Sequence, residues 1–164
     1  FQWDMRQKGA WSDKESRRYK NGPVVSPGNY IAKLTVGEKI LEQPFEILVD
    51  PRLAEEGIDN TIILDHLAFE NKVIDLLTEA RKFQSELEAQ IKKTKGDEKA
   101  SLETVLKEIK NDEGAYPQQM LVAQISYLSY IVGGADKVPG NEEVERLKEL
   151  QQQFNSVKNK VKLN

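Results

Sequence analysis

The sequence contains no cysteine and only one histidine among its 164 residues. Without cysteine, the chain can form neither a disulfide nor a thiolate metal site. The histidine, His66, follows Asp65 directly and lies four residues before Glu70. A lone histidine without converging cysteine or carboxylate ligands rarely holds a metal ion. We therefore expect a structural or solvated role for His66, and no metal or other cofactor.

The sequence also lacks long apolar runs and an excess of basic charge. It has no run of about 18 apolar residues, which a membrane-spanning helix would need. Its 24 Lys and Arg residues against 27 Asp and Glu residues give a net charge of −3. Affinity for nucleic acid depends mostly on Lys and Arg, so this balance provides no general attraction to phosphate. We expect neither a membrane span nor a nucleic-acid partner.

Sequence motifs of catalysis are missing as well. There is no Gly-rich phosphate loop, no nucleophile elbow and no Cys-His pattern. Two acidic pairs occur, Glu55-Glu56 and Glu142-Glu143, but glycosidases need carboxylates held across a cleft. We place both pairs near helix starts, where acidic side chains interact favourably with the helix dipole. The chain therefore offers no catalytic residue.

The sequence changes character near Asp50-Pro51-Arg52. Before this point lie six aromatic residues and most of the alternating apolar pattern, and after it Leu, Glu, Lys and Gln recur at helical spacing. The change predicts an α+β protein in two parts. These are a β module over residues 1–52 and an antiparallel helical bundle over residues 53–164.

The first part predicts about three strands, at residues 1–5, 29–36 and 39–49. Gly37-Glu38 forms a tight reversal, and Pro44 marks a sheet edge or a bulge because proline has no N–H for the ladder. The residues expected to face inward are Tyr30, Ala32, Leu34, Val36, Phe45, Ile47 and Val49. A sandwich has about seven strands. We therefore predict a partial antiparallel Ig-like β-sandwich, completed by upstream sequence, a second copy or the helices.

The second part predicts four helices. Apolar residues recur three and four apart from about residue 59 to residue 95, which is typical of one long helix buried along a stripe. A shorter helix is predicted over 98–111, a third from Pro117 to Gly133-Gly134, and a last one over 141–161. Short connections favour antiparallel neighbours, so the prediction is an antiparallel helical bundle with one long helix.

Two aromatic residues, Trp11 and Tyr19, lie in the polar stretch between the first two predicted strands. Trp3 and Tyr30 instead fit the inward face of strands and are expected in the core. Exposed loop aromatics sometimes mark a binding site. Trp11 and Tyr19 are therefore the candidate ligand contacts, and carbohydrate is the ligand class that we consider for them.

Several short motifs together resemble one protein family. They are FQWDMR at 1–6, GPVVSPGNY at 22–30, LTVG at 34–37, VDPR at 49–52 and ADKVP at 135–139. This pattern resembles the C-terminal region of large bacterial proteins with BNR/sortilin-like β-propeller repeats, which are often labelled glycosyl hydrolases. In that family an Ig-like module, similar to that of the flagellar hook-capping protein, precedes a helical tail. Gly140 departs from the family, which often has a helix-capping Thr there.

The resemblance implies a β-propeller upstream in the same protein and export to the periplasm or the cell exterior. The opening residues, from Phe1 onward, already alternate like the inside of a strand, so we expect the chain to be part of a larger protein. Any active site would belong to the propeller, and no catalytic residue carries over. The expected function is therefore a non-catalytic, structural one, with the propeller or a second copy as partner through an open sheet edge or the helices. The alternative is a carbohydrate-binding module that acts through Trp11 and Tyr19.

Overall fold

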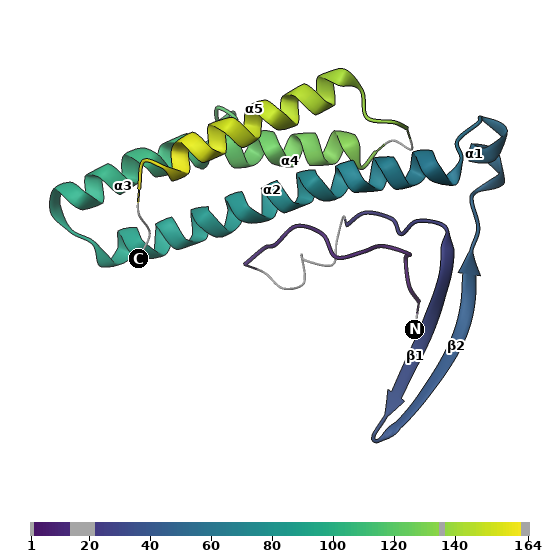
Figure 1. Cartoon of the computed structure of the whole chain (residues 1–164). Coiled ribbons are helices and arrows are strands. Elements are labelled where there is room, and N and C mark those ends of the chain that lie inside the picture. Colours follow the sequence, from purple (N-terminus) through teal and green to yellow (C-terminus); the bar gives the residue numbers. More distant parts are fainter. Residues whose placement is uncertain (1, 14–21, 135–136, 162–164) are drawn as a thin grey trace.

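The computed structural model describes residues 2–13, 22–134 and 137–161. In these residues it has a two-stranded antiparallel sheet and five helices, which confirms the α+β class (Figure 1). The elements are β1 (Gly28–Val36), β2 (Lys39–Ile47), α1 (Pro51–Glu55), α2 (Asn60–Lys93), α3 (Gly96–Ile109), α4 (Leu121–Val132) and α5 (Asn141–Lys158).

The helix α2 is the common support of the fold. It has 34 residues, which at 1.5 Å per residue gives a rod about 50 Å long. The Asp59 carboxylate accepts a hydrogen bond from the N–H of Ile62 at 3.0 Å, so a side-chain cap defines where the helix begins. After α2, Gly96 adopts a φ of +65°, a conformation that glycine reaches without strain, and α3 returns along the C-terminal part of α2. The predicted long helix is confirmed.

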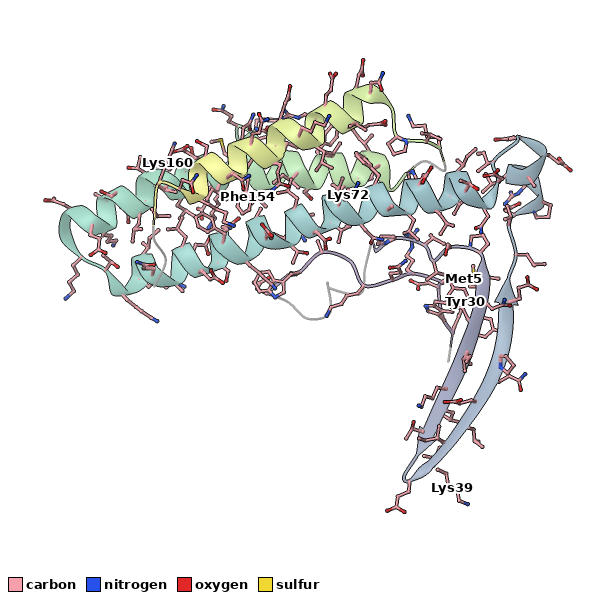
Figure 2. The ribbon with its side chains drawn as sticks, in the orientation of Figure 1. Met5, Tyr30, Lys39, Lys72, Phe154 and Lys160 are labelled. Atoms are coloured by element: carbon pink, nitrogen blue, oxygen red, sulfur yellow. The ribbon has the colours of Figure 1, made fainter. Side chains whose placement is uncertain are left out.

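The remaining helices arrange themselves along α2 in succession. α3 covers one end of α2, α4 lies along its other part, and α5 packs on α4 (Figure 1). The predicted antiparallel bundle with one long helix is not matched in detail, because α3 and α4 share the length of α2 between them and α5 packs mainly on α4. Figure 2 shows Phe154 among these helices, where it is fully buried and packs edge-to-face on Phe83 with ring centroids 5.8 Å apart.

One predicted helix start is wrong. The third helix, α4, begins at Leu121 and not at Pro117. The backbone N–H of Met120 donates to Oδ1 of Asn111 at 2.7 Å, and the amide of Asn111 donates to Gln119. These bonds hold the connection before α4 as an irregular segment. The N–H of Met120, which would bond to a backbone carbonyl in a longer helix, bonds to the side chain of Asn111 instead.

The predicted Ig-like sandwich does not appear in the described residues, whose only sheet is the hairpin of β1 and β2. The first predicted strand is wrong. Met5 has a φ of +58°, which interrupts an extended strand, and Asp4 accepts a hydrogen bond from the N–H of Arg6 in a local turn. What remains of strand pairing there is one isolated antiparallel bridge between Arg6 and Val24.

The segment that follows this bridge packs on the helices. Ala10 is 7% exposed and belongs to the helical core. The N–H of Trp11 donates to Oγ1 of Thr78 at 3.1 Å, and Nη1 of Arg81 donates to the carbonyl of Trp11 at 3.3 Å. Part of the described sequence before Asp50, at Ala10 and Trp11, therefore packs on α2 and the helical core.

The hairpin of β1 and β2, which we call the hairpin arm, extends away from the helices (Figure 1). Gly37 has a φ of +60° at the first position of the two-residue loop, as a type II′ turn requires, so the predicted reversal is confirmed. The register pairs Tyr30 with Phe45 and Leu34 with Leu41, as the predicted alternation requires. The predicted burial is wrong, however, because Leu34 and Val36 are 58% and 63% exposed. No other described element packs over the outer part of the arm.

Candidate functional site

The main surface feature is one side of the hairpin arm. In an antiparallel pair, residues opposite each other point to the same face, and the face alternates along each strand. The register therefore gathers six apolar side chains on one side, which we call the apolar hairpin face: Tyr30, Ala32, Leu34, Val36, Leu41 and Phe45. Gln43, Lys39 and, near the base, Ile47 point to the same side. Leu41 is 63% exposed, like its neighbours Leu34 and Val36, so the face is largely open to solvent.

Aromatic rings fix the base of this face. The Trp3 ring packs edge-on against Tyr30 and Phe45, each at a centroid distance of 6.3 Å, and Tyr30 stacks on Phe45 at 5.7 Å. The Tyr30 hydroxyl donates to the carbonyl of Ser26 at 2.7 Å. Beyond these rings the arm continues to a solvent-exposed tip at Lys39 (Figure 2). The arm is thus anchored at its base and extended at its tip.

The opposite side of the arm is more polar. Lys33 and Glu42 form an ion pair across the two strands at 3.4 Å, with both side chains about half exposed. Ile31 and Ile40 lie on this side too, separated by the charged pair. The two sides therefore differ in chemistry, because the apolar hairpin face carries more apolar side chains, with Gln43 and Lys39 as its polar members.

A second feature is a cavity of about 890 Å³ between the N-terminal segment, α2 and α4. The candidate Trp11 lines it, together with the ring of Tyr130 and the polar side chains of Arg81 and Gln84. Trp11 is half-buried, and its backbone bonds to α2 hold it at the wall of the cavity. The other candidate, Tyr19, lies outside the described residues.

An acidic group at the rim of this cavity keeps its charge. Burial acts to raise the pKa of Glu88, but hydrogen bonds from Gln84 and Lys110 outweigh it and hold the pKa below its ordinary value of 4.5. The ammonium of Lys110 lies 3.0 Å from the carboxylate oxygen. The cavity is therefore lined by hydrogen-bonding groups and by charges of both signs.

His66 has structural contacts. Its Nδ1 lies 2.7 Å from the carbonyl oxygen of Lys137, and its Nε2 lies 3.8 Å from Oε2 of the buried Glu70. These contacts connect the loop between α4 and α5 to the first turns of α2. Among the described residues, no group of three or more His, Cys, Asp or Glu side chains could hold a metal ion.

The two acidic pairs, Glu55-Glu56 and Glu142-Glu143, lie at opposite kinds of helix end. Glu143 lies in the first turn of α5, where its carboxylate accepts a hydrogen bond from the N–H of Gly140 and pairs with Lys137 at 3.2 Å. The Gly140 bond, helped by Lys137, lowers the pKa of Glu143 below 4.5. The helix-start role is confirmed here. It is wrong for Glu55 and Glu56, which stand at the end of α1.

Within the described part of the chain, no helix is long and apolar enough to cross a membrane. Comparisons with models of known protein families, with curated proteins and with solved structures found no match.

Sequence reasoning missed the residues that attach the N-terminal segment to α2. Thr78 accepts a hydrogen bond from the N–H of Trp11, and Arg81 donates one to its carbonyl. Ala10 belongs to the hydrophobic core. In the sequence, Thr78 and Arg81 look like ordinary exposed positions between the apolar residues of the stripe. The apolar residue Ala10 beside Trp11 in a polar stretch was the one available signal of this contact.

Proposed function

We propose that the chain is a non-catalytic structural module that packs, through its apolar hairpin face, against the β-propeller part of a larger exported protein. The observation that carries this proposal is the exposure of Leu34, Val36 and Leu41, each more than half open to solvent on one side of the arm. Adjoining exposed apolar side chains on a folded protein mark interaction sites. The resemblance of residues 1–52 to the Ig-like module of propeller proteins supports a propeller as the partner.

The build of the arm fits such a role. Its base is held by the Trp3, Tyr30 and Phe45 rings, while its outer part has no packing partner among the described residues. A two-stranded hairpin alone is marginally stable in water, and a covering layer stabilises it. In this proposal the arm is part of an Ig-like sandwich whose other strands come from the partner side.

The test compares hydrogen exchange of the backbone amides in this chain alone and in the full-length protein. We expect the amides of β1 and β2 to exchange more slowly in the full-length protein, and those of the α2 core to stay unchanged. A Leu34→Gln variant of the full-length protein should lose part of this added protection. Arm amides that exchange equally fast in both proteins would show that the propeller does not cover the arm.

A second candidate function, carbohydrate binding, is favoured by the cavity beside Trp11. Sugars bind to aromatic rings accompanied by hydrogen-bonding side chains, and Trp11, Tyr130, Arg81 and Gln84 supply both at this site.

Tryptophan fluorescence tests this second candidate, because the chain has only two tryptophans, Trp3 and Trp11. A Trp3→Phe variant leaves Trp11 as the only reporter, and titration with a panel of soluble polysaccharides should then change its emission in a saturable way. A Trp11→Phe variant serves as the matched control and should show no such change. Constant emission in both variants across the panel, with no heat of binding, would rule this candidate out.

A further inference from the structure

The two edges of the hairpin arm differ in their backbone donors. In a hairpin with a two-residue loop, the flanking residues Val36 and Lys39 form a hydrogen-bonded pair, and bonded and non-bonded pairs alternate from there. Ile31 and Pro44 therefore form a non-bonded pair, whose backbone polar groups point away from the hairpin. Because Pro44 has no backbone N–H, the outer edge of β2 has one hydrogen-bond donor fewer at this position.

The outer edge of β1 has no such interruption. Its outward N–H groups belong to Asn29, Ile31, Lys33 and Thr35, and none of these is proline. An edge with a complete row of unpaired donors and acceptors is a template for another strand, whereas proline blunts an edge. The outer part of β1 also lies away from the helices, so a strand can approach it (Figure 1).

We propose that β1 pairs antiparallel with β1 of a second copy of this chain, across a two-fold axis at Ala32. Ala32 is the central residue of the nine in β1, so this register pairs the strand along its whole length. The product is a four-stranded sheet in the order β2-β1-β1-β2. The inference concerns a strand edge and does not depend on the propeller partner, which would contact the apolar face.

The side chains favour this register. Tyr30 comes to lie opposite Leu34 of the second copy, and Lys33 opposite Ile31 of the second copy. A register centred one residue later along β1 would place Lys33 directly opposite Lys33 of the second copy. Like charges in opposite positions destabilise a sheet. The charge of Lys33 therefore disfavours the register centred on Lys33, and pairing along the whole of β1 favours the one centred on Ala32.

The arrangement is also closed. Both outer edges of the four-stranded sheet are β2 strands that carry Pro44, so further growth is blocked. A sheet of three or more strands with an apolar face is more stable than an isolated hairpin. Because the two-fold axis runs perpendicular to the sheet, the two apolar hairpin faces lie on the same side and become continuous.

Cross-linking through a single introduced cysteine tests the two-fold axis, since the chain has no cysteine of its own. Ala32 would meet Ala32 of the second copy in a non-bonded pair, where Cα atoms lie about 4.5 Å apart, within the range that a disulfide spans. We expect Ala32→Cys to give a covalent dimer under mild oxidation. Thr35→Cys, which would face Asn29 of the second copy, should not. Equal cross-linking of both variants, or none in Ala32→Cys, would overturn the proposal.

A matched pair of proline variants tests the edge. Ile31→Pro removes an outward N–H from β1, and Ile40→Pro removes one from β2, with both isoleucines on the same face of the arm. In sedimentation equilibrium the wild-type protein should show a dimer of the 18.7 kDa chain. Ile31→Pro should weaken dimerisation about tenfold or more, and Ile40→Pro should leave it near the wild-type value.

A wild-type protein that stays monomeric at every concentration would overturn the dimer. Equal weakening by the two proline variants would overturn the choice of edge. If Ile31→Pro instead lowered protection of the arm in the full-length protein while no dimer formed, β1 would pair with a strand of the propeller and not with a second copy. That result would leave the proposed function standing and reject this inference.

Discussion

The helical body and the hairpin arm both repeat apolar residues at the period of their own secondary structure, but they differ in what covers those residues. On the helices, Phe154, Leu87 and Ile125 are fully buried. On the arm, Leu34 and Leu41 are 58% and 63% exposed. The α2 stripe meets α3, α4 and α5 within the same chain, whereas the outer part of the apolar hairpin face meets no other described element.

This difference separates stability from interaction. Burial of apolar area stabilises a fold by about 25 cal/mol per Å², so the free energy of folding is concentrated in the helices. Apolar residues on the arm gain little from folding of this chain alone, and they remain available for a partner. The following predictions test how far this separation holds.

The largest effect is expected for Phe154→Ala, which should lower the free energy of unfolding by about 3–5 kcal/mol, because it empties a fully buried site against Phe83. Phe45→Ala in the arm is the matched control and should cost only about 1 kcal/mol, since its ring is 37% exposed. Urea unfolding followed by circular dichroism measures both. A similar cost for the two variants would show that the arm belongs to the cooperative core.

A smaller effect is expected for Gly133→Ala at the end of α4. The added Cβ would lie 2.9 Å from Oε1 of Glu70 and 3.2 Å from the carbonyl of Ser129, so the buried carboxylate must shift. We expect a loss of about 1–3 kcal/mol in the free energy of unfolding.

Gly134→Ala is the control for this change. Its Cβ would meet only the carbonyls of Tyr130 and Ile131 at 3.4 and 3.5 Å, which are ordinary contacts. Its stability should stay within about 0.5 kcal/mol of the wild type in thermal and urea unfolding. A Gly133→Ala variant as stable as Gly134→Ala would mean that Glu70 is not held tightly against α4.

A pH-dependent effect is expected for Glu143→Gln at the start of α5. The pKa of Glu143 is lowered in the folded protein, first by the N–H of Gly140 and then by Lys137. Its contribution is therefore present above the ordinary pKa of 4.5 and is lost as the pH falls through the lowered folded value. Near pH 7 we expect a cost of about 1 kcal/mol, typical of a lost helix cap.

Unfolding measured from pH 7 down to pH 3 should show the wild-type and Glu143→Gln curves converging at the acidic end. Glu142→Gln, in the same helical turn but exposed, should change the stability by only a few tenths of a kcal/mol. A Glu143→Gln cost that is constant with pH would reject the charged cap.

The smallest effect on stability is expected for Leu34→Gln in the arm. Because Leu34 is largely exposed, its replacement should change the free energy of unfolding by less than about 0.5 kcal/mol. Chemical denaturation of the isolated chain measures this, and Leu150→Gln, at a fully buried position, provides the contrast. A loss of several kcal/mol for Leu34→Gln would show that the arm is covered in solution, and the comparison drawn above would fail.

The helices were the most predictable elements. The 3-4 spacing located α2 within two residues, and α5 began at the predicted Asn141. α4 was placed too early because Pro117 satisfies the local rule for a first turn. The N–H of Met120 instead donates to the side chain of Asn111, nine residues earlier, and α4 begins only after it. The hairpin turn was predictable because Gly37 and its neighbours determine it locally.

The candidate site was less predictable. The alternation of apolar residues identified which arm residues share a face. We predicted that this face is buried in a core, but a strand pattern does not indicate whether another layer covers it. Trp11 was identified as a loop aromatic, but its attachment to Thr78 and Arg81 depends on residues almost seventy positions away. No local pattern encodes contacts of that range.

The amino-acid sequence by itself determined the secondary structure of the arm and the long helices, the alternation of the apolar hairpin face and the absence of cysteine chemistry. These properties depend on periodicity, caps and turn residues within a few positions of one another. Only the tertiary structure decided that α2 buries its stripe while the arm exposes its own, and that Ala10 and Trp11 pack on the helices. Burial depends on which elements meet in space, and that outcome is decided by packing among distant parts of the chain.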